Sequence, residues 1–537
     1  MARVNGATLL ARSLRLGGVG PVFTLSGHQI LPIYDAGIDE NLRFVDTRHE
    51  GAAVHMADGW GRLTGQTGVA LVTAAPGHTN ALTGVATAFN SESPLLLLSG
   101  GAEVPNLGRG GFQEMDQLTM IGPISKGAWM PKTAEEVPNL VARAFRVATS
   151  GVPGPVHLTL PYDVLHQTVD EDAITMPEPG DFERIPHGAT RRHLARLVDL
   201  LAEARRPIVL GGGSAFRGRA ATLLAELSDL TGLPSLPIDS AVGLGEPSLH
   251  GLARVLPDCD LVVMLVRQDF AVGFADENTI SSSAKLVQVS PDATLIGQNR
   301  RVDLGIIGDP EIVLSQLVTA ARERTWAPGG WPSELDSMRQ AQQERTRALE
   351  SSTDVPVHPM RVAAAVKEFL RPGDCVALDG GDYVRSARWL FGGGPYELLT
   401  NGKLGALGPG IPLALAATLA RPNARSVAFV GDGTFGFHAM ELDTAVRHNL
   451  PAVVVVGNDA GWATERHRQR EVYGPDRLVA ADLLPTRYDL VAQNLGAHGE
   501  FVERPEQLKV ALERAFASGK PACVNVNIAS IRAPSAS

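Results

Sequence analysis

The chain has 537 residues, of which 44% are hydrophobic and 20% are charged, and its formal net charge is −10. This length predicts three or four compact units of roughly 150 residues each. The negative charge argues against a nucleic-acid partner, which needs a basic patch, and no apolar run reaches the ~18 residues that a membrane-spanning helix needs. Three widely spaced cysteines without a CxxC pair, Cys259, Cys375 and Cys523, are expected to be reduced, buried thiols of a cytoplasmic protein.

Alternating apolar runs and helical stretches fall into three blocks, which predicts an α/β protein with three doubly wound parallel-sheet domains. Two polar segments, the first rich in acidic residues and proline, separate the blocks and are typical of linkers. The expected boundaries are a first domain over residues 1–165, a linker over 166–188, a middle domain over 189–325, a linker over 326–356 and a third domain over 357–537.

Short apolar runs bounded by glycine or proline mark the expected buried strands. They are Val69–Thr73, Pro94–Ser99 and Gly154–Val164 in the first domain, Pro207–Leu210, Asp260–Leu265 and Lys285–Val289 in the middle domain, and Cys375–Leu378, Ser426–Val430 and Pro451–Gly457 in the third. The amphipathic segment Gly6–Leu16 predicts the first helix.

The strongest chemical signal is the segment SVAFVGDGTFGFHAMELDTAVRHNLPAVVVVGND, which has the pattern strand, GDG turn, helix, strand, asparagine. Asp432 and Asn458 each follow the end of a predicted parallel strand, and open α/β sheets bind ligands at that edge. Asp432 offers a carboxylate and Asn458 an amide oxygen, and the backbone carbonyl of Ala460 would complete the protein ligands. Hard oxygen ligands of this kind suit Mg²⁺ that also binds a phosphate group.

The glycines of the GDG turn are expected to let a phosphate approach the backbone at Gly431 and Gly433, with Thr434 donating to it from a helix N-terminus. A lone GDG is more often an ordinary turn. Here a strand precedes each half, and residues 434–457 separate the turn from Asn458. This spacing resembles the diphosphate-binding motif of thiamine-diphosphate enzymes, and the resemblance implies thiamine diphosphate and Mg²⁺ as cofactors.

A second motif, FVDTRHEGAAVHMADGWGRLTG, places Glu50 after a short strand, Arg43–Asp46, and at the start of a helix. The helix dipole alone favours glutamate in a first turn. Together with the diphosphate motif, however, the pattern RHE-A-x-x-H-x-A-x-G-x-x-R resembles the pyrimidine-side motif of the same enzymes. The resemblance implies that Glu50 bonds the aminopyrimidine of the cofactor and activates it for cleavage or formation of a C–C bond.

Further cofactor contacts follow from the same resemblance. The segment GKLGALGPGIPLALAA resembles the element that props the two cofactor rings together, with Leu407 at the propping position, although an ordinary core leucine is the alternative. Gly77 in the loop TAAPGHTNALTG is expected to lie against the cofactor, as are Gly381 and Asp382 after the first strand of the third domain. Trp462 is expected to do so in the loop after the magnesium asparagine.

Resemblance extends over nearly the whole chain and indicates one branch of this superfamily. VFTLSGHQILPIYDA and TAAPGHTNALTGVATAF resemble acetolactate synthases, and RHE and GGFQEMDQ also resemble benzaldehyde lyase. GDGTFGFHAMELDT and RYDLVAQNLGAHGEFVERPEQL are most similar to 2-hydroxyacyl-CoA lyase and oxalyl-CoA decarboxylase. Phe112 and Gln113 stand where oxalyl-CoA decarboxylases carry Tyr-Glu, which argues against that activity.

Five residues are candidates for the substrate pocket. His28 and His78 each follow a predicted strand in a glycine-rich loop, where a neutral imidazole donates to a substrate oxygen or relays a proton. The alternative for both is a loop histidine bonded to backbone. Gln113 is expected to orient the cofactor-bound intermediate, with a solvated loop residue as its alternative, and Gln29 and Trp462 complete the set.

The middle domain is a possible site for a second cofactor. Acetolactate synthases carry a GARFDDR-like segment that helps to hold FAD, whereas this chain has LVRQDFAVGF over Leu265–Phe274, so neither FAD nor ADP is favoured there. A FAD-linked oxidase or decarboxylase of 2-oxo acids remains an alternative function. A non-catalytic regulatory homologue is another, and the presence of Glu50, Asp432 and Asn458 argues against it.

The sequence therefore predicts a thiamine-diphosphate- and Mg²⁺-dependent lyase or carboligase acting on 2-oxo acids or 2-hydroxy carbonyl compounds, acyl-CoA among the candidate substrates. The resemblance implies a homodimer or homotetramer in which Glu50 of one subunit meets the metal site of another. The N-terminal segment has no signal-peptide pattern, which predicts a cytoplasmic protein. Neither a nucleic acid nor a membrane is expected as a partner.

Overall fold

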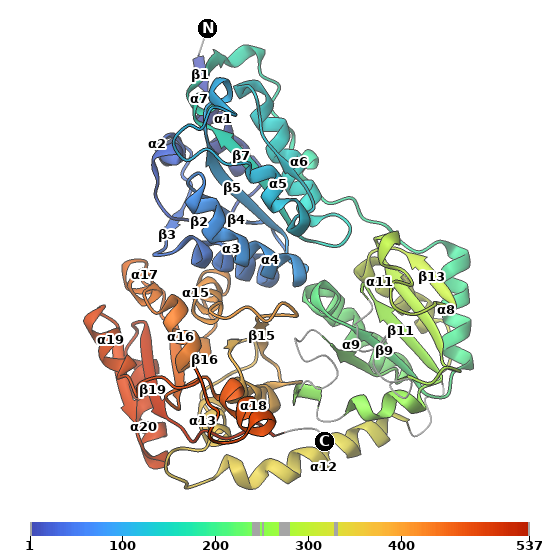
Figure 1. Ribbon diagram of the computed structural model, residues 1–537. Helices are drawn as coiled ribbons and strands as arrows, with labels where there is room; N and C mark the ends of the chain where they lie inside the picture. The colour runs from blue at the N-terminus through green and yellow to red at the C-terminus, as the bar shows by residue number, and fades with distance from the viewer. Residues whose placement is uncertain (1–2, 239–246, 250–251, 268–279, 327–330, 535–537) are drawn as a thin grey trace. The chain divides into compact units, whose positions relative to one another are not determined.

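The computed structural model of the chain is drawn in Figure 1. It describes residues 3–238, 247–249, 252–267, 280–326 and 331–534. The chain divides into two compact units, one of residues 1–185 with 415–420 and the other of residues 186–414 with 421–537. Within the described residues, no helix combines the length and the apolar character needed to cross a membrane.

The first unit is built on a six-stranded sheet with the order β3-β2-β4-β5-β7-β6, and every strand pair in it is parallel. Its strands are β2 (Val22–Thr24), β3 (Phe44–Asp46), β4 (Gly68–Val72), β5 (Leu95–Gly101), β6 (Ala128–Trp129) and β7 (Pro155–Pro161). Its α-helices are α1 (Gly6–Leu16), α2 (Leu31–Asp39), α3 (Glu50–Thr64), α4 (Pro76–Asn90), α5 (Gln117–Ile121), α6 (Val137–Thr149) and α7 (Tyr162–His166). Every residue of β4, β5 and β7 is buried, as expected for strands covered on both faces.

A separate two-stranded ribbon joins the two ends of this unit. β1 (Arg3–Asn5) pairs antiparallel with β8 (Thr168–Asp170), so a strand lies inside the segment predicted to be a linker. Each strand of the ribbon buries only its central valine, Val4 or Val169. One buried residue in three gives no alternating pattern, which is why the sequence did not indicate this pairing.

The second unit contains a five-stranded parallel sheet with the order β10-β9-β11-β12-β13. Its strands are β9 (Pro207–Gly211), β10 (Ser235–Pro237), β11 (Leu261–Leu265), β12 (Lys285–Ser290) and β13 (Leu304–Ile307), and its helices are α8 (Arg191–Glu203), α9 (Gly218–Thr231) and α11 (Pro310–Arg322). The long helix α12 (Trp331–Glu350) leads to the next sheet. The segment that argued against FAD lies outside the described residues beyond Arg267, so that argument stays a prediction.

The same unit contains a six-stranded parallel sheet with the order β15-β14-β16-β17-β19-β18. Its strands are β14 (Cys375–Asp379), β15 (Glu397–Thr400), β16 (Ser426–Gly431), β17 (Val453–Asn458), β18 (His498–Val502) and β19 (Ala522–Asn527). Its helices are α13 (Pro359–Lys367), α14 (Asp382–Phe391), α15 (Gly410–Ala420), α16 (Asp432–His438), α17 (Glu441–Arg447), α18 (Ala463–Tyr473), α19 (Tyr488–Asn494) and α20 (Leu508–Ala517). The three parallel sheets confirm the predicted fold class.

The register of the central strands of this sheet determines where its site lies. β14, β16 and β17 are adjacent, with Asp379 opposite Val430 and Gly431 opposite Gly457. Because all three strands run in one direction, the residues that follow them leave the sheet at the same edge. That edge therefore carries Asp432 and the loop after Asn458, as the strand pattern predicted.

Candidate active site

Asp432 begins α16 at the carboxyl end of β16 and is only 2% exposed. Its carboxylate accepts hydrogen bonds from the backbone N–H groups of Gly433 at 3.0 Å and Gly461 at 2.9 Å. Burial, and then the negative charge of Asp459, raise the pKa of Asp432 to about 7. A carboxylate destabilised in this way gains from a bound cation, which restores its charged form.

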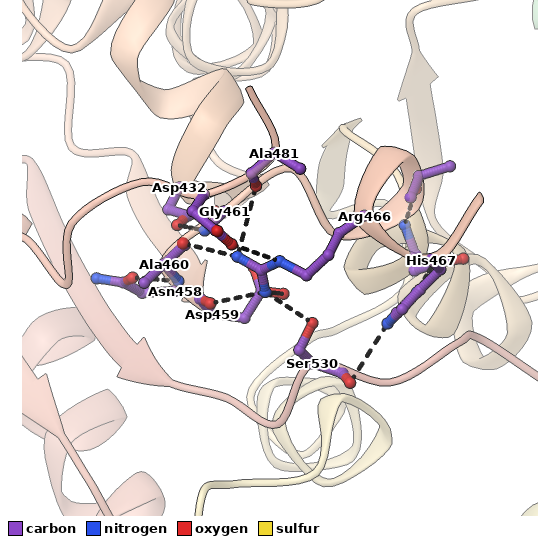
Figure 2. Close-up of polar contacts among 12 residues, drawn as sticks. Asp432, Asn458, Asp459, Ala460, Gly461, Arg466, His467, Ala481 and Ser530 are labelled. Atoms are coloured by element: carbon purple, nitrogen blue, oxygen red, sulfur yellow. Dashed lines mark hydrogen bonds and ion pairs between the residues drawn. The ribbon is translucent and has the colours of Figure 1, made fainter. Parts of the chain in front are cut away.

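Asn458 ends β17, and its side-chain amide is fixed in orientation. Nδ2 donates to the carbonyl oxygen of Thr486 at 2.8 Å, while Oδ1 accepts the backbone N–H of Ala460 at 3.2 Å. The amide oxygen therefore faces the loop that follows the strand. Figure 2 shows Asp432, Asn458 and Ala460 gathered around this loop.

Ala460 adopts a left-handed backbone conformation with φ of 54°, which is uncommon for a residue other than glycine. Its carbonyl oxygen accepts two hydrogen bonds of 2.8 Å, from the backbone N–H of Leu483 and from Nη2 of Arg466. The next residue, Gly461, forms an antiparallel bridge with Asp482. Backbone N–H groups of this loop thus bond the side chains of Asp432 on α16 and Asn458 at the end of β17, which connects the three predicted metal ligands.

These ligands suit magnesium better than a transition metal. Among the residues that the structure describes, no group of three or more His, Cys, Asp and Glu side chains is placed to hold a metal. Asp432, Asn458 and Ala460 instead offer one carboxylate, one amide oxygen and one carbonyl. Mg²⁺ commonly takes few protein ligands of this type and completes its shell with water and phosphate oxygens.

A cavity of about 380 Å³ opens beside the loop. Its lining includes every cofactor-binding residue predicted in the second unit, namely Gly381, Asp382, Leu407, Gly431, Gly433, Thr434 and Trp462. Residues near the C-terminus, among them Ile528 and Ile531, line it as well. The structure therefore brings together side chains that are far apart in the sequence.

Two glycines let the cavity wall form. A Cβ atom on Gly433 would lie 2.6 Å from the ring of Trp462, and one on Gly381 would clash with the hydroxyl of Thr464. The hydroxyl of Thr434 donates to two backbone carbonyl oxygens, that of Asp379 at 3.1 Å and that of Gly431 at 3.0 Å. Its predicted phosphate contact would therefore come from its backbone N–H near the start of α16. This wall of backbone groups fits a diphosphate.

The carboxylate of Asp382 is not presented to the cavity as a free group. Asp382 is 2% exposed; its Oδ2 lies 2.9 Å from Nδ1 of His467 and its Oδ1 lies 3.8 Å from Nη1 of Arg385. Its backbone N–H donates to Thr464 Oγ1 at 3.0 Å. The side chain thus joins α14 to α18, and these partners screen a charge that would repel an anionic cofactor.

Asp379 is a buried acid that the sequence reading missed. It ends β14, and its Oδ2 accepts the backbone N–H groups of Gly408 and Gly410, each at 3.0 Å. Burial raises the pKa of Asp379 to about 7. It fixes the start of α15 and with it the loop of Leu407. An acid at the end of the apolar run CVALD was the available signal.

In the first unit, Glu50 is the first residue of α3 and is 8% exposed. His49 caps the helix, its Nδ1 accepting the N–H of Gly51 at 2.9 Å. Glu50 Oε2 accepts a hydrogen bond of 3.0 Å from Nδ2 of Asn80, and a Cβ atom on Gly77 would lie 3.6 Å from Oε1. The structure thus places the predicted Gly77 beside Glu50 and adds Asn80.

Gln113 is held by a chain of side-chain hydrogen bonds. Thr73 Oγ1 donates to Gln29 Oε1 at 2.6 Å, and Gln29 Nε2 donates to Gln113 Oε1 at 2.8 Å. Gln29 is buried, whereas Gln113 is partly exposed. Because the oxygen of Gln113 is used in this chain, its Nε2 group is left as the outward donor.

The two candidate histidines differ in their surroundings. His28 is exposed and its ring stacks on Tyr162 with centroids 5.1 Å apart. His78 lies inside α4, is fully buried, and places Nδ1 3.0 Å from Ser99 Oγ. Burial lowers the pKa of His78 to about 4, and its ring centroid is 4.8 Å from that of His157. Within the described part of the chain, the buried Nε2 of His78 has no hydrogen-bond partner, so its predicted contact with the substrate stays a prediction.

A parallel α/β sheet with one carboxylate, one amide and one carbonyl oxygen around a backbone cradle is typical of a protein that binds a diphosphate group. Three family descriptions match the chain: "Thiamine pyrophosphate enzyme, N-terminal TPP binding domain" over residues 4–120, "central domain" over 194–317 and "C-terminal TPP binding domain" over 379–526. The chain belongs to the thiamine pyrophosphate enzyme family.

Named relatives lie in the predicted branch. A probable acetolactate synthase of Mycobacterium bovis is 36% identical over 97% of this chain and 95% of its own length. 2-hydroxyacyl-CoA lyase 2 of Homo sapiens is 32% identical over 98% of this chain and 90% of its own length. A 2-hydroxyacyl-CoA lyase of Arabidopsis thaliana is 30% identical over 98% of this chain and 96% of its own length. These similarities confirm the predicted family and its acetolactate synthase and 2-hydroxyacyl-CoA lyase relatives.

Proposed function

We propose that this chain is a Mg²⁺-dependent thiamine-diphosphate enzyme that forms or cleaves a C–C bond beside a carbonyl. Its substrates would be 2-oxo acids or 2-hydroxy carbonyl compounds, including 2-hydroxyacyl-CoA. The observation that carries this proposal is the hydrogen-bonded arrangement of Asp432 at the start of α16, Asn458 at the end of β17 and Ala460 in the loop that follows, at one edge of the third sheet. The buried Glu50 at the start of α3 supports it independently.

The residues of the third sheet would bind and orient the diphosphate end. Asp432, Asn458 and the carbonyl of Ala460 would hold Mg²⁺, and backbone N–H groups at the start of α16 would donate to phosphate oxygens. Leu407 and Trp462 line the same cavity and would exclude water from the rings. When bound, thiamine diphosphate supplies a carbon nucleophile and an electron sink for the bond next to the carbonyl.

Glu50 would hold and move a proton at the pyrimidine end. The N–H of Asn80 fixes Oε2 of Glu50, which leaves Oε1 to bond a ring nitrogen. Burial in a helix first turn keeps this carboxyl group in one place, as general acid–base catalysis requires. The side chain of Asn80 is thus a positioning group for the acid.

Gln113 would orient the substrate. With its oxygen taken by Gln29, its Nε2 group offers a hydrogen-bond donor. A donor matches the carboxylate or carbonyl oxygen of a 2-oxo acid and the thioester oxygen of an acyl-CoA alike. This hydrogen-bond donor therefore supports both substrate types and does not distinguish a 2-oxo acid from an acyl-CoA.

We also propose a cytoplasmic homodimer or homotetramer. All three cysteines are buried free thiols, a state typical of reducing compartments. Phe437, Met440 and Leu404 of the second unit expose 54%, 45% and 43% of their surfaces. Apolar side chains exposed near a cofactor cavity are typical of surfaces covered by another subunit. Sedimentation analysis of the purified protein tests the assembly, and a monomeric result would contradict it.

A substrate panel tests the proposed reaction. Purified protein with added thiamine diphosphate and Mg²⁺ would be given pyruvate, 2-hydroxyacyl-CoA, benzoin, or formyl-CoA plus an aldehyde, with products identified by mass spectrometry. A C–C ligation or cleavage product from at least one of these is expected. Absence of cofactor binding by calorimetry would favour a regulatory homologue, and a yellow protein with a flavin absorbance band would favour the FAD-linked oxidase.

A further inference from the structure

The loop between β17 and α18, residues 459–462, is called the metal loop below. The guanidinium group of Arg466 lies at the centre of the polar contacts around it, as Figure 2 shows. Arg466 is on α18, and its side chain is only 11% exposed. Nη2 donates to the carbonyl oxygen of Ala460 at 2.8 Å, and Nη1 donates to Ser530 Oγ at 3.1 Å. Nε forms an ion pair with Asp482 Oδ1 at 3.0 Å. The side chain of Arg466 therefore connects the loop to Ser530 near the C-terminus and to Asp482.

The loop needs such support because its backbone is strained. Ala460 has φ of 54° without being a glycine, and a conformation of this kind persists only when its surroundings hold it. The turn directs the N–H of Gly461 to Asp432 at 2.9 Å and the N–H of Ala460 to Asn458 at 3.2 Å. If the turn relaxed, each of the two side chains would lose one of the hydrogen bonds that hold it.

The packing around Gly461 shows how closely the guanidinium group of Arg466 approaches the backbone of the loop. A Cβ atom at Gly461 would clash with Nη2 of Arg466. The same Cβ atom would lie 2.6 Å from the backbone carbonyl oxygen of Ala481. Gly461 does not have a positive φ, so these two close approaches, rather than backbone conformation, account for the glycine. The Arg466 side chain thus takes the space beside the turn that a side chain at position 461 would fill.

Arg466 also balances a second carboxylate. Nη1 lies 3.5 Å from Oδ2 of Asp459, whose side chain is 5% exposed, and 3.3 Å from its carbonyl oxygen. Both of these contacts place the positive charge of Arg466 beside the carboxylate of Asp459. Removal of Arg466 therefore changes geometry and charge together, and an experiment must separate these two effects.

We propose that Arg466 is a positioning residue for the metal loop, where its planar donor fork holds the left-handed turn at Ala460. This inference rests on the proposed Mg²⁺ site. The fork arranges the oxygens of Asp432, Asn458 and Ala460 before the cation binds. Besides its bond to the Ala460 carbonyl, Arg466 contacts Asp459, Ser530 and Asp482, and these contacts would keep its side chain beside the turn when a cation is bound.

Two variants separate the fork from its charge. Arg466→Lys keeps the positive charge but loses the planar fork. The double variant Arg466→Met with Asp459→Asn removes one charge of each sign and leaves the net charge of the loop unchanged. Both are expected to bind Mg²⁺ roughly 10-fold or more weakly in the presence of thiamine diphosphate, as is usual when an outer partner of a metal ligand is lost. Isothermal titration with Mg²⁺ gives the affinity directly.

Matched controls identify the cause. Arg468→Lys makes the same substitution at an exposed position of α18 and should bind Mg²⁺ like the wild type. Asp459→Asn alone should stay within a few-fold of it. Circular dichroism and the melting temperature of the cofactor-free proteins show whether each variant folds. A folded Lys variant and a folded double variant that bind Mg²⁺ with wild-type or higher affinity would overturn the inference. A wild-type protein that binds neither Mg²⁺ nor thiamine diphosphate would instead overturn the proposed function.

Discussion

Asn80 Nδ2 donates a hydrogen bond to Glu50 Oε2 at 3.0 Å, and this contact joins the N-terminal parts of two helices that follow different strands. α3 and α4 approach closely because they meet at small residues: a Cβ atom on Gly84 would lie 2.8 Å from the side chain of Val54. The carboxyl group of Glu50 is thus oriented by its neighbouring helix.

Glu50→Gln is expected to bind thiamine diphosphate with near wild-type affinity and to lose turnover by at least ~100-fold, the usual contribution of a general acid–base group. The amide oxygen of glutamine still accepts the hydrogen bond from Asn80, but the side chain cannot exchange a proton. Calorimetry gives the affinity and the substrate panel gives the rate. Substantial turnover by a cofactor-saturated Gln variant would remove Glu50 from the mechanism.

The sequence predicted the fold because the strands are short apolar runs with little ambiguity. The predicted Lys285–Val289 and Ser426–Val430 are each only one residue shorter than β12 and β16. The helix predicted over Gly6–Leu16 has those same bounds. In a sheet of parallel strands, the strand ends fix the edge where ligands bind. Asp432 and Asn458 could therefore be assigned to one site without coordinates.

Residues that act through contacts distant in sequence could not be predicted. Asn80 lies in the segment TAAPGHTNALTG, yet no pattern in this segment shows which face of α4 meets Glu50. An arginine in a polar helix such as α18 is expected to be exposed, and nothing in the sequence shows that Arg466 bonds the carbonyl oxygen of Ala460. His78 was predicted to lie in a glycine-rich loop at the end of a strand, whereas it lies within α4, and its contacts with Ser99 and His157 depend on tertiary packing.

The carboxamide of Gln29 should control substrate affinity through Gln113. Gln29→Leu removes the donor that holds Gln113 Oε1, so Gln113 is expected to rotate and the KM for the donor substrate to rise about 10-fold, equivalent to one hydrogen bond. Gln113→Ala should give a similar rise. Because both act through one contact, the double variant should be little worse than either single variant. Additive effects in steady-state kinetics would show that the two residues act separately.

Two buried histidines should make the protein sensitive to acid. Burial lowers the pKa of His78 to about 4 and that of His157 to about 3, against about 6.5 in an unfolded chain. The folded state thus binds fewer protons, and their contribution to stability is complete above pH 6.5 and is lost as the pH falls towards 4. His157→Gln stays neutral, so its melting temperature should fall less between pH 7 and pH 5 than that of the wild type. Equal pH profiles in scanning calorimetry would contradict this assignment.

Asp379 should produce the opposite pH dependence. Burial raises its pKa to about 7, against about 3.9 in an unfolded chain. The folded state therefore binds a proton more tightly, and the stability from this group is complete below about pH 4 and is lost as the pH rises through 7. Asp379→Asn keeps an oxygen for the N–H groups of Gly408 and Gly410 but cannot ionise. The melting temperature of the cofactor-free variant should fall less between pH 5 and pH 8 than that of the wild type. A variant with the wild-type slope would show that Asp379 is already protonated, or already paired, throughout this range.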